Sequence, residues 1–241
     1  MCQTSSSERR AELAANLEDV RNRIAAACAA AGRDHGDLTL VAVTKTRPAA
    51  DVRLLSGLGV TDVGENRDQE AEPKAVACAD LPLTWHFVGQ LQSNKASHVV
   101  RYADVVHSVD RARLVRALGA AARAADRLAG RELTCLVQVS IDGDPGRGGV
   151  PVASVIPLAE QIEAEPGLRL GGVMAVAPVG MDPARSFAKL RECSDSLLRV
   201  RSGATVISAG MSGDLEEAVR AGATHLRIGT ALLGARRPPV R

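Results

Sequence analysis

The chain has 241 residues and carries a net charge of +2. Its length and its hydrophobic content of 46% are enough for one barrel-sized core or two small domains. The near-neutral charge and an aromatic content of 2% exclude the usual signatures of nucleic-acid-binding and base-stacking surfaces. No apolar run is long enough to span a bilayer, and the opening MCQTSSSERRAE lacks the apolar core of a signal peptide.

Cysteine and histidine usage bears on the compartment and on metals. The five cysteines are scattered without a C-x-x-C pair, which indicates thiols in a reducing compartment rather than a disulfide framework. The five histidines show no shared ligand spacing. A cytoplasmic protein without a metal site is therefore expected.

Hydrophobic periodicity predicts alternating helices and strands. A leading helix is expected over 7–31, where apolar residues recur at helical spacing before Gly32. Eight strands are then expected at 38–45, 60–66, 84–89, 104–109, 133–141, 168–177, 205–210 and 225–234. Helices are expected between them at 48–55, 67–79, 93–102, 111–128, 152–165, 183–198 and 214–221. Ser93 and Asp110 are expected to cap two of these helices.

Eight strands alternating with helices through short connections are typical of a (β/α)₈ barrel, here with a helix leading. No proline- or serine-rich linker divides the chain, so a single domain over 1–241 is expected, with flexible ends at about 1–7 and 236–241. A doubly wound open sheet is the alternative, although it usually has fewer strands at this length.

The run LTLVAVT leads into Lys45 and is followed by Pro48. Such a run is typical of a strand buried on both faces, and alternation places Lys45 on the face of Val41 and Val43. A lysine at the carboxyl end of a barrel strand lies where such enzymes keep their chemistry, and desolvation favours the neutral, nucleophilic amine. The alternative is a lysine that only extends to solvent at the rim.

The loops after the seventh and eighth expected strands carry the residues of an anion site. Residues 210–213, Gly-Met-Ser-Gly, lead into a helix whose backbone N–H groups suit an anion, and Ser212 adds a hydroxyl. Gly229 and Thr230 offer N–H groups at close approach, and barrels often bind phosphate between these loops. Strands one and eight are neighbours in a closed barrel, so a lysine beside a phosphate site predicts pyridoxal phosphate (PLP). The alternative is that the glycines only turn the chain.

Arg227 alternates with Leu226 and Ile228, so it shares a face with Gly229 and is expected to point into the barrel. A guanidinium there needs an acceptor, because a lone buried charge is very costly. The pyridine nitrogen of PLP would serve. A buried salt bridge to a carboxylate such as Glu65 is the alternative.

Five motifs in order, AVTKTRP, VGENRDQE, WHFVGQLQSNK, GMSGDLEEAV and LRIGTALLG, resemble the YggS family of PLP-binding homeostasis proteins over nearly the whole chain beyond the first helix. The resemblance implies the barrel of the alanine racemase N-terminal domain, PLP fold type III, without the β-rich second domain. It implies that Lys45 forms a Schiff base with PLP, that Asn66 lies near the ring and that Arg227 faces the pyridine nitrogen. It assigns the phosphate to Ser212, Gly229 and Thr230, and the pocket lining to Met211 and the turn from Ser208 to Gly210.

Two positions depart from the family pattern. Many members have a lysine in the loop after the fifth strand, where this chain has Arg147, and arginine cannot form a Schiff base. The serine that often precedes the signature lysine is Thr44, which keeps the hydroxyl.

The residues favour a binding protein over an efficient enzyme. A two-base racemase needs an acid/base on each face of the substrate carbon. The single tyrosine, Tyr102, is expected at the rim of the barrel opposite to Lys45, where it does not serve as the second acid/base. An arginine at the ring nitrogen also weakens the electron sink. The leading hypothesis is a monomer that holds PLP reversibly, limits the free aldehyde and delivers it to apo-enzymes. The alternatives are a weak PLP-dependent racemase using Lys45 with water or His86, and a barrel for another phosphorylated metabolite.

Overall fold

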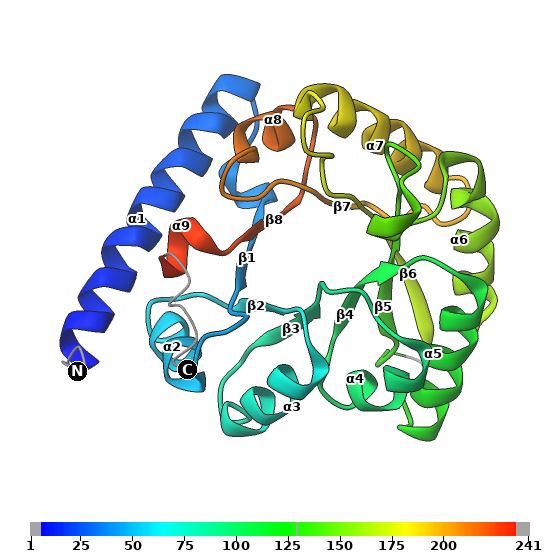
Figure 1. The fold of residues 1–241 in the computed structure, drawn as a ribbon, viewed down its shortest axis with the longest axis horizontal. Helices are drawn as coiled ribbons and strands as arrows, with labels where there is room; N and C mark the ends of the chain where they lie inside the picture. The colour runs from blue at the N-terminus through cyan, green and yellow to red at the C-terminus, as the bar shows by residue number, and fades with distance from the viewer. Residues whose placement is uncertain (1–5, 129, 235–241) are drawn as a thin grey trace.

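In the computed structural model, which describes residues 6–128 and 130–234, eight parallel strands close into a barrel (Figure 1). The strands are β1 (Thr39–Val43), β2 (Asp62–Glu65), β3 (Thr84–Phe87), β4 (Val105–Val109), β5 (Leu133–Gln138), β6 (Leu168–Met174), β7 (Val206–Ser208) and β8 (His225–Ile228). Each pairs with the next in sequence, and β8 closes the ring on β1. The predicted (β/α)₈ barrel is confirmed, and the open-sheet alternative is wrong.

Helices surround the barrel (Figure 1). They are α1 (Ser6–Ala31), α2 (Ala49–Ser56), α3 (Asp68–Ala77), α4 (Ala96–Tyr102), α5 (Ala112–Ala124), α6 (Val155–Ala164), α7 (Pro183–Leu197), α8 (Leu215–Arg220) and α9 (Thr230–Leu233). Short 3₁₀ turns are η1 (His35–Asp37), η2 (Ser93–Lys95), η3 (Pro145–Arg147) and η4 (Val152–Ser154). The leading helix α1 packs against α8, α9 and α2 through a buried stripe that includes Leu13, Leu17 and Val20. None of the described helices is long and apolar enough to cross a membrane.

The main core lies between the barrel and its helices. Outward-facing strand residues such as Phe87, Ile207 and Leu226 are buried in it. Strand residues alternate between the two faces, so the polar His86 and Ser208, adjacent to these apolar residues, point into the barrel. This alternation gives the barrel a polar interior, which the site uses.

Several predicted boundaries are wrong. The last strand ends at Ile228 rather than at 234, because the chain turns at Gly229 and residues 230–233 form one helical turn, α9. The strands β5, β6 and β7 also end earlier than expected, and α5 ends at Ala124. Of the ends expected to be flexible, 1–5 and 236–241 lie outside the described residues, whereas residues 6 and 7 belong to the first turn of α1.

Both predicted caps are wrong. The N-cap of α5 is Arg111, with no side-chain cap bond, and the Asp110 carboxylate instead pairs with the Arg111 guanidinium. Ser93 opens the turn η2, while α4 begins at Ala96 without a side-chain cap. The Ser93 hydroxyl accepts from Arg111 at 3.4 Å. Contacts with the Arg111 guanidinium therefore replace the side-chain-to-backbone bonds that capping residues usually make.

Candidate functional site

A cavity of about 390 Å³ opens at the carboxyl ends of the strands, within the range of small-molecule sites. Its walls include seven of the nine predicted residues: Lys45, Asn66, Met211, Ser212, Arg227, Gly229 and Thr230. The other two lie behind the wall. Ser208 is fully buried and bonded to Arg227, and the Gly210 carbonyl accepts from the Arg227 backbone N–H at 2.9 Å.

Lys45 enters the cavity from the turn that ends β1. It is partly buried, and the next residue, Thr46, has a φ of 65°. Left-handed backbone is unusual for a β-branched residue, and such strain is often found at functional sites. The Thr46 N–H donates to Glu70 Oε2 at 3.0 Å, which holds the turn from outside the cavity. Lys45 thus follows the strand in a tight turn rather than extending the strand along the rim.

A buried ion pair supports this turn from below. Glu65, at the end of β2, accepts from Lys74 Nζ and from Thr44 Oγ1, each at 2.6 Å. Burial raises the pKa of the Glu65 carboxyl, although the bonds from Lys74 and Thr44 act against that rise. Lys74 also donates to the Thr44 carbonyl at 2.9 Å. Glu65 therefore forms its ion pair with Lys74. The predicted alternative, a salt bridge from Arg227 to Glu65, is wrong.

The loop after β7 is closed by its own carboxylate. The Met211 N–H donates to Asp214 Oδ1 at 2.6 Å, so it does not face the cavity as a vacant donor. Gly210 has a φ of 87°, and a Cβ there would lie 2.6 Å from the Ala218 Cβ, so the turn requires glycine. The expectation that this loop presents its N–H groups to an anion is therefore wrong for Met211.

Ser212 joins the two expected phosphate loops. Its hydroxyl accepts from the Ala231 N–H in α9 at 3.1 Å and keeps its own proton for a ligand oxygen. Arg23 of α1 donates to the Ser212 carbonyl at 3.1 Å and pairs with Glu216 of α8. The leading helix thus holds the β7 loop against the start of α9, where Gly229 and Thr230 line the cavity.

Arg227 crosses the inner wall of the cavity with 5% of its surface exposed. It donates to Ser208 Oγ at 2.7 Å and to the Ala175 carbonyl at 2.9 Å. Among the described residues, no carboxylate lies within ion-pair distance of its guanidinium. Burial lowers its pKa to about 10, so the group remains charged near neutral pH. The remaining guanidinium donors suit an acceptor in the cavity.

The other residues named from the sequence lie outside the cavity wall. Arg147 donates to the Ala177 carbonyl at 3.1 Å, between the loops after β5 and β6. Lys95 lies 3.9 Å from Asp68 Oδ2. Tyr102 ends α4 and packs edge-on against Trp85, with its phenol buried and burial raising its pKa. His86, a candidate racemase base, is buried inside the barrel.

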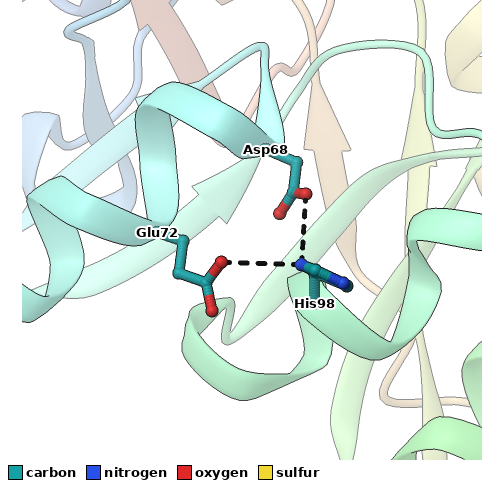
Figure 2. A group of neighbouring side chains, drawn as sticks. All are labelled: Asp68, Glu72 and His98. Carbon is teal, nitrogen blue, oxygen red and sulfur yellow. Dashed lines mark ion pairs between the residues drawn. The ribbon is translucent and has the colours of Figure 1, made fainter.

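A small cluster beside the mouth joins Asp68, Glu72 and His98 (Figure 2). His98 Nδ1 lies 3.7 Å from Asp68 Oδ2 and 3.5 Å from Glu72 Oε2. Lys95 and Arg101 pair with the same two carboxylates. The negative charge is therefore balanced by cationic side chains, as in an ion-pair network between α3 and α4.

A larger cavity, about 890 Å³, lies at the amino ends of β7 and β8, between α7 and α8. Its charged walls mix Arg191 and Arg220 with Asp195 and Glu217. It lies at the face opposite to the one where barrels hold their chemistry, and its groups do not converge on one ligand chemistry. The smaller cavity at the strand ends is therefore the candidate site.

The alanine racemase N-terminal domain model matches residues 10–237. The chain belongs to this family. A Mycobacterium tuberculosis protein named pyridoxal phosphate homeostasis protein is 42% identical, over 95% of each chain. The structure of PipY from Synechococcus elongatus with PLP bound has a TM-score of 0.78 and 34% identity, covering 92% of this chain and all of PipY.

The racemase barrel itself is a more distant relative. Alanine racemase from Corynebacterium glutamicum has a TM-score of 0.67 at 14% identity, and the match covers 94% of this chain but 61% of the racemase. This likeness shows the fold alone. The chain therefore shares the barrel of the racemases, while its homologues of similar length are named for PLP homeostasis.

Sequence reasoning missed several residues that shape the site. The sequence pattern gives Lys74 only a place in the helix expected over 67–79, although a buried carboxylate at Glu65 requires a nearby partner. Asp214 accepts from the backbone N–H three residues before it, a short-range bond that the local sequence can signal. Arg23 carries no local signal, because its partners lie about 190 residues away in the chain.

Proposed function

We propose that this protein binds PLP in the cavity at the strand ends and serves PLP homeostasis, holding the cofactor as a Schiff base on Lys45. One observation carries the proposal. Lys45 and a buried Arg227 without a carboxylate partner among the described residues line one cavity, whose rim is formed by Ser212 and the start of α9. Bound PLP supplies three groups: a pyridine ring, a phosphate, and an aldehyde that condenses with an amine.

The groups present fit PLP. Arg227 supplies donors for the ring nitrogen, and Ser212 with the backbone at Gly229 and Thr230 suits the phosphate. Asn66 follows β2, the strand beside β1, and lines the same cavity as Lys45. The PLP-bound PipY structure and the name of the mycobacterial relative support the same ligand.

The wall composition favours a holder over a racemase. Among the described residues of the cavity wall, Lys45 is the only side chain suited to act as a base; the wall contains no tyrosine, histidine, cysteine or carboxylate. Two-base racemisation needs a second acid/base on the other face of the substrate carbon. Arg227, charged at the ring nitrogen, would also keep the pyridine unprotonated and weaken electron withdrawal. Slow or absent turnover is therefore expected.

The proposal extends to the partners and the compartment. The described cysteines, Cys28, Cys78, Cys135 and Cys193, are buried free thiols, which fits a reducing cytoplasm. We infer that the protein acts as a monomer and passes PLP to apo-enzymes. Direct delivery would be supported if the loaded protein activates an apo-enzyme faster than PLP dissociates from the loaded protein on dilution.

Borohydride trapping tests the site. The chain contains four lysines, Lys45, Lys74, Lys95 and Lys189, so peptide mapping of the reduced protein distinguishes them cleanly. We expect an absorption band near that of PLP Schiff bases and label on Lys45 alone. Lys45→Ala should lose both, and Lys189→Ala should keep both. Label on another lysine overturns the assignment, and no band in the presence of excess PLP supports a different phosphorylated metabolite.

Amino-acid turnover separates the holder from the racemase. The loaded protein should racemise a panel of amino acids no faster than free PLP at the same concentration. Turnover that survives purification and disappears in Lys45→Ala would support the weak racemase instead.

A further inference from the structure

A continuous file of hydrogen bonds crosses the barrel interior from the cavity to the opposite rim. Arg227 of β8 donates to Ser208 Oγ of β7 at 2.7 Å, and Ser208 lies 2.9 Å from His107 Nδ1 of β4. His107 Nε2 lies 2.8 Å from His86 Nδ1 of β3, and His86 Nε2 lies 2.9 Å from Asp62 Oδ1 at the start of β2. These strands are not all neighbours in the ring (Figure 1), so only barrel closure brings the file together.

Hydrogen-bond chemistry gives the file one direction. Arg227 can only donate, so Ser208 accepts and its own proton is available for His107 Nδ1. His107 then carries its proton on Nε2 and donates to His86. His86 in turn carries its proton on Nε2 and donates to the carboxylate of Asp62. With both histidines neutral, this is the arrangement in which every bond has one donor and one acceptor.

The reverse direction fails at its end. If His107 carried its proton on Nδ1, a neutral His86 would present a lone pair to the Asp62 carboxylate, and two acceptors would face each other. A doubly protonated His86 would remove that conflict. It would also place another positive charge beside the buried His107 and Arg227 and leave the Ser208 proton without its acceptor.

The surroundings of His107 agree with a neutral ring. Burial, together with the cationic guanidinium of Arg227, lowers the pKa of His107 well below its usual value. The ring centroids of His225 and His86 are 6.0 Å apart. Burial lowers the pKa of His225 to about 4. Burial acts to raise the pKa of Asp62, but the hydrogen bonds from His86 and Thr61 outweigh it and hold the carboxyl ionised.

We propose that Ser208, His107, His86 and Asp62 are positioning residues for Arg227, and that their directed file holds its guanidinium against the ring nitrogen of PLP. The role rests on the proposed function. Ser208 is the pivot, because it must accept from Arg227 only while His107 takes its proton. Asp62 is the terminal acceptor, and its charge sets the direction of every bond up to the cavity.

The first test reads the file in the protein without PLP. ¹⁵N NMR of histidine-labelled protein at neutral pH should show His86 and His107 as neutral Nε2–H tautomers with protons that exchange slowly. Single His→Gln variants assign the signals, with His35→Gln as an exposed control. A His107 proton on Nδ1, or a doubly protonated His86, overturns the proposal. Because PLP is absent, this outcome is independent of whether PLP binds.

The second test measures whether a change at Asp62, the terminal residue of the file, alters the state of His107. Asp62→Asn removes the terminal charge without touching His107, and it should shift the His107 ¹⁵N resonances. Asp37→Asn, a change of the same charge near the same rim in η1, should leave them in place. Unchanged His107 resonances in Asp62→Asn would mean that the contacts do not act as one file.

The third test uses the ligand. Ser208→Ala should weaken PLP binding by about tenfold, since it removes a hydrogen bond to a charged group. The 1-deaza analogue of PLP has a C–H in place of the ring nitrogen. Ser208→Ala should therefore change the affinity of the protein for this analogue by less than about twofold. An equal loss for both ligands would indicate a structural role only and overturn the positioning role. Failure of both ligands to bind the unaltered protein would instead refute the proposed function.

Discussion

Two buried cations in this barrel have opposite surroundings. Lys74 lies 2.6 Å from a carboxylate oxygen of Glu65, which is itself fully buried. Arg227 donates to the Ser208 hydroxyl and the Ala175 carbonyl, and among the described residues no carboxylate pairs with it. The first charge is neutralised within the protein, whereas the second is retained at the wall of a cavity. The difference distinguishes a structural charge from one poised for a ligand.

Breaking the structural pair should have the largest effect. Lys74→Met leaves Glu65 buried without its cation, and we expect a loss of about 3–5 kcal/mol in the free energy of unfolding, measured by urea denaturation. Asp195→Asn, which removes the exposed partner of Arg191, should cost less than about 0.5 kcal/mol. Equal losses in the two variants would show that Glu65 and Lys74 are not a buried pair in solution.

The histidine near Arg227 should make stability depend on pH. The folded pKa of His225 is lowered from 6.5 to about 4, so the unfolded chain binds the extra proton more readily. Stability is then fully present above about pH 6.5 and is lost as the pH falls towards 4, by up to about 3 kcal/mol. His225→Asn should lose part of this slope in urea titrations at several pH values. A parent slope retained in full by the variant would contradict the assignment.

A ligand bound in the cavity that Arg227 lines should stabilise the folded protein. PLP at about 100 times its Kd should raise the free energy of unfolding by about 2.7 kcal/mol. Lys45→Ala should lose most of this gain, and Lys95→Ala should keep it. Thermal denaturation with and without PLP measures the effect. Equal stabilisation by pyridoxal, which lacks the phosphate, would argue against the roles of Ser212 and α9.

Removing the second cation should have the smallest effect on stability. Arg227→Met abolishes a buried charge that pairs with no carboxylate among the described residues, which offsets the loss of its hydrogen bonds. The free energy of unfolding should therefore change by about 1 kcal/mol or less. The same variant should bind PLP at least about tenfold more weakly. A stability loss as large as that of Lys74→Met would erase the distinction between the two cations.

The order of the strands and the place of Lys45 were predictable because both depend on local pattern. Apolar runs and helical spacing recur along the chain, and each strand pairs with the next in sequence. Gly210 and the β7 loop were likewise readable, since a turn needs glycine where φ is positive. The early end of β8 was not, because β-propensity and one turn of helix compete over four residues.

The sequence by itself determined a barrel, a lysine at the end of its first strand, glycine-rich loops after its last strands and an arginine that faces inward. Only the tertiary structure decided which acceptors that arginine would find, that Lys74 would take Glu65, and that Asp62, His86, His107 and Ser208 would meet in one file. The reason is geometric. Alternation tells which residues point into a barrel, but the tilt and stagger of the closed strands set which of them come within hydrogen-bonding distance.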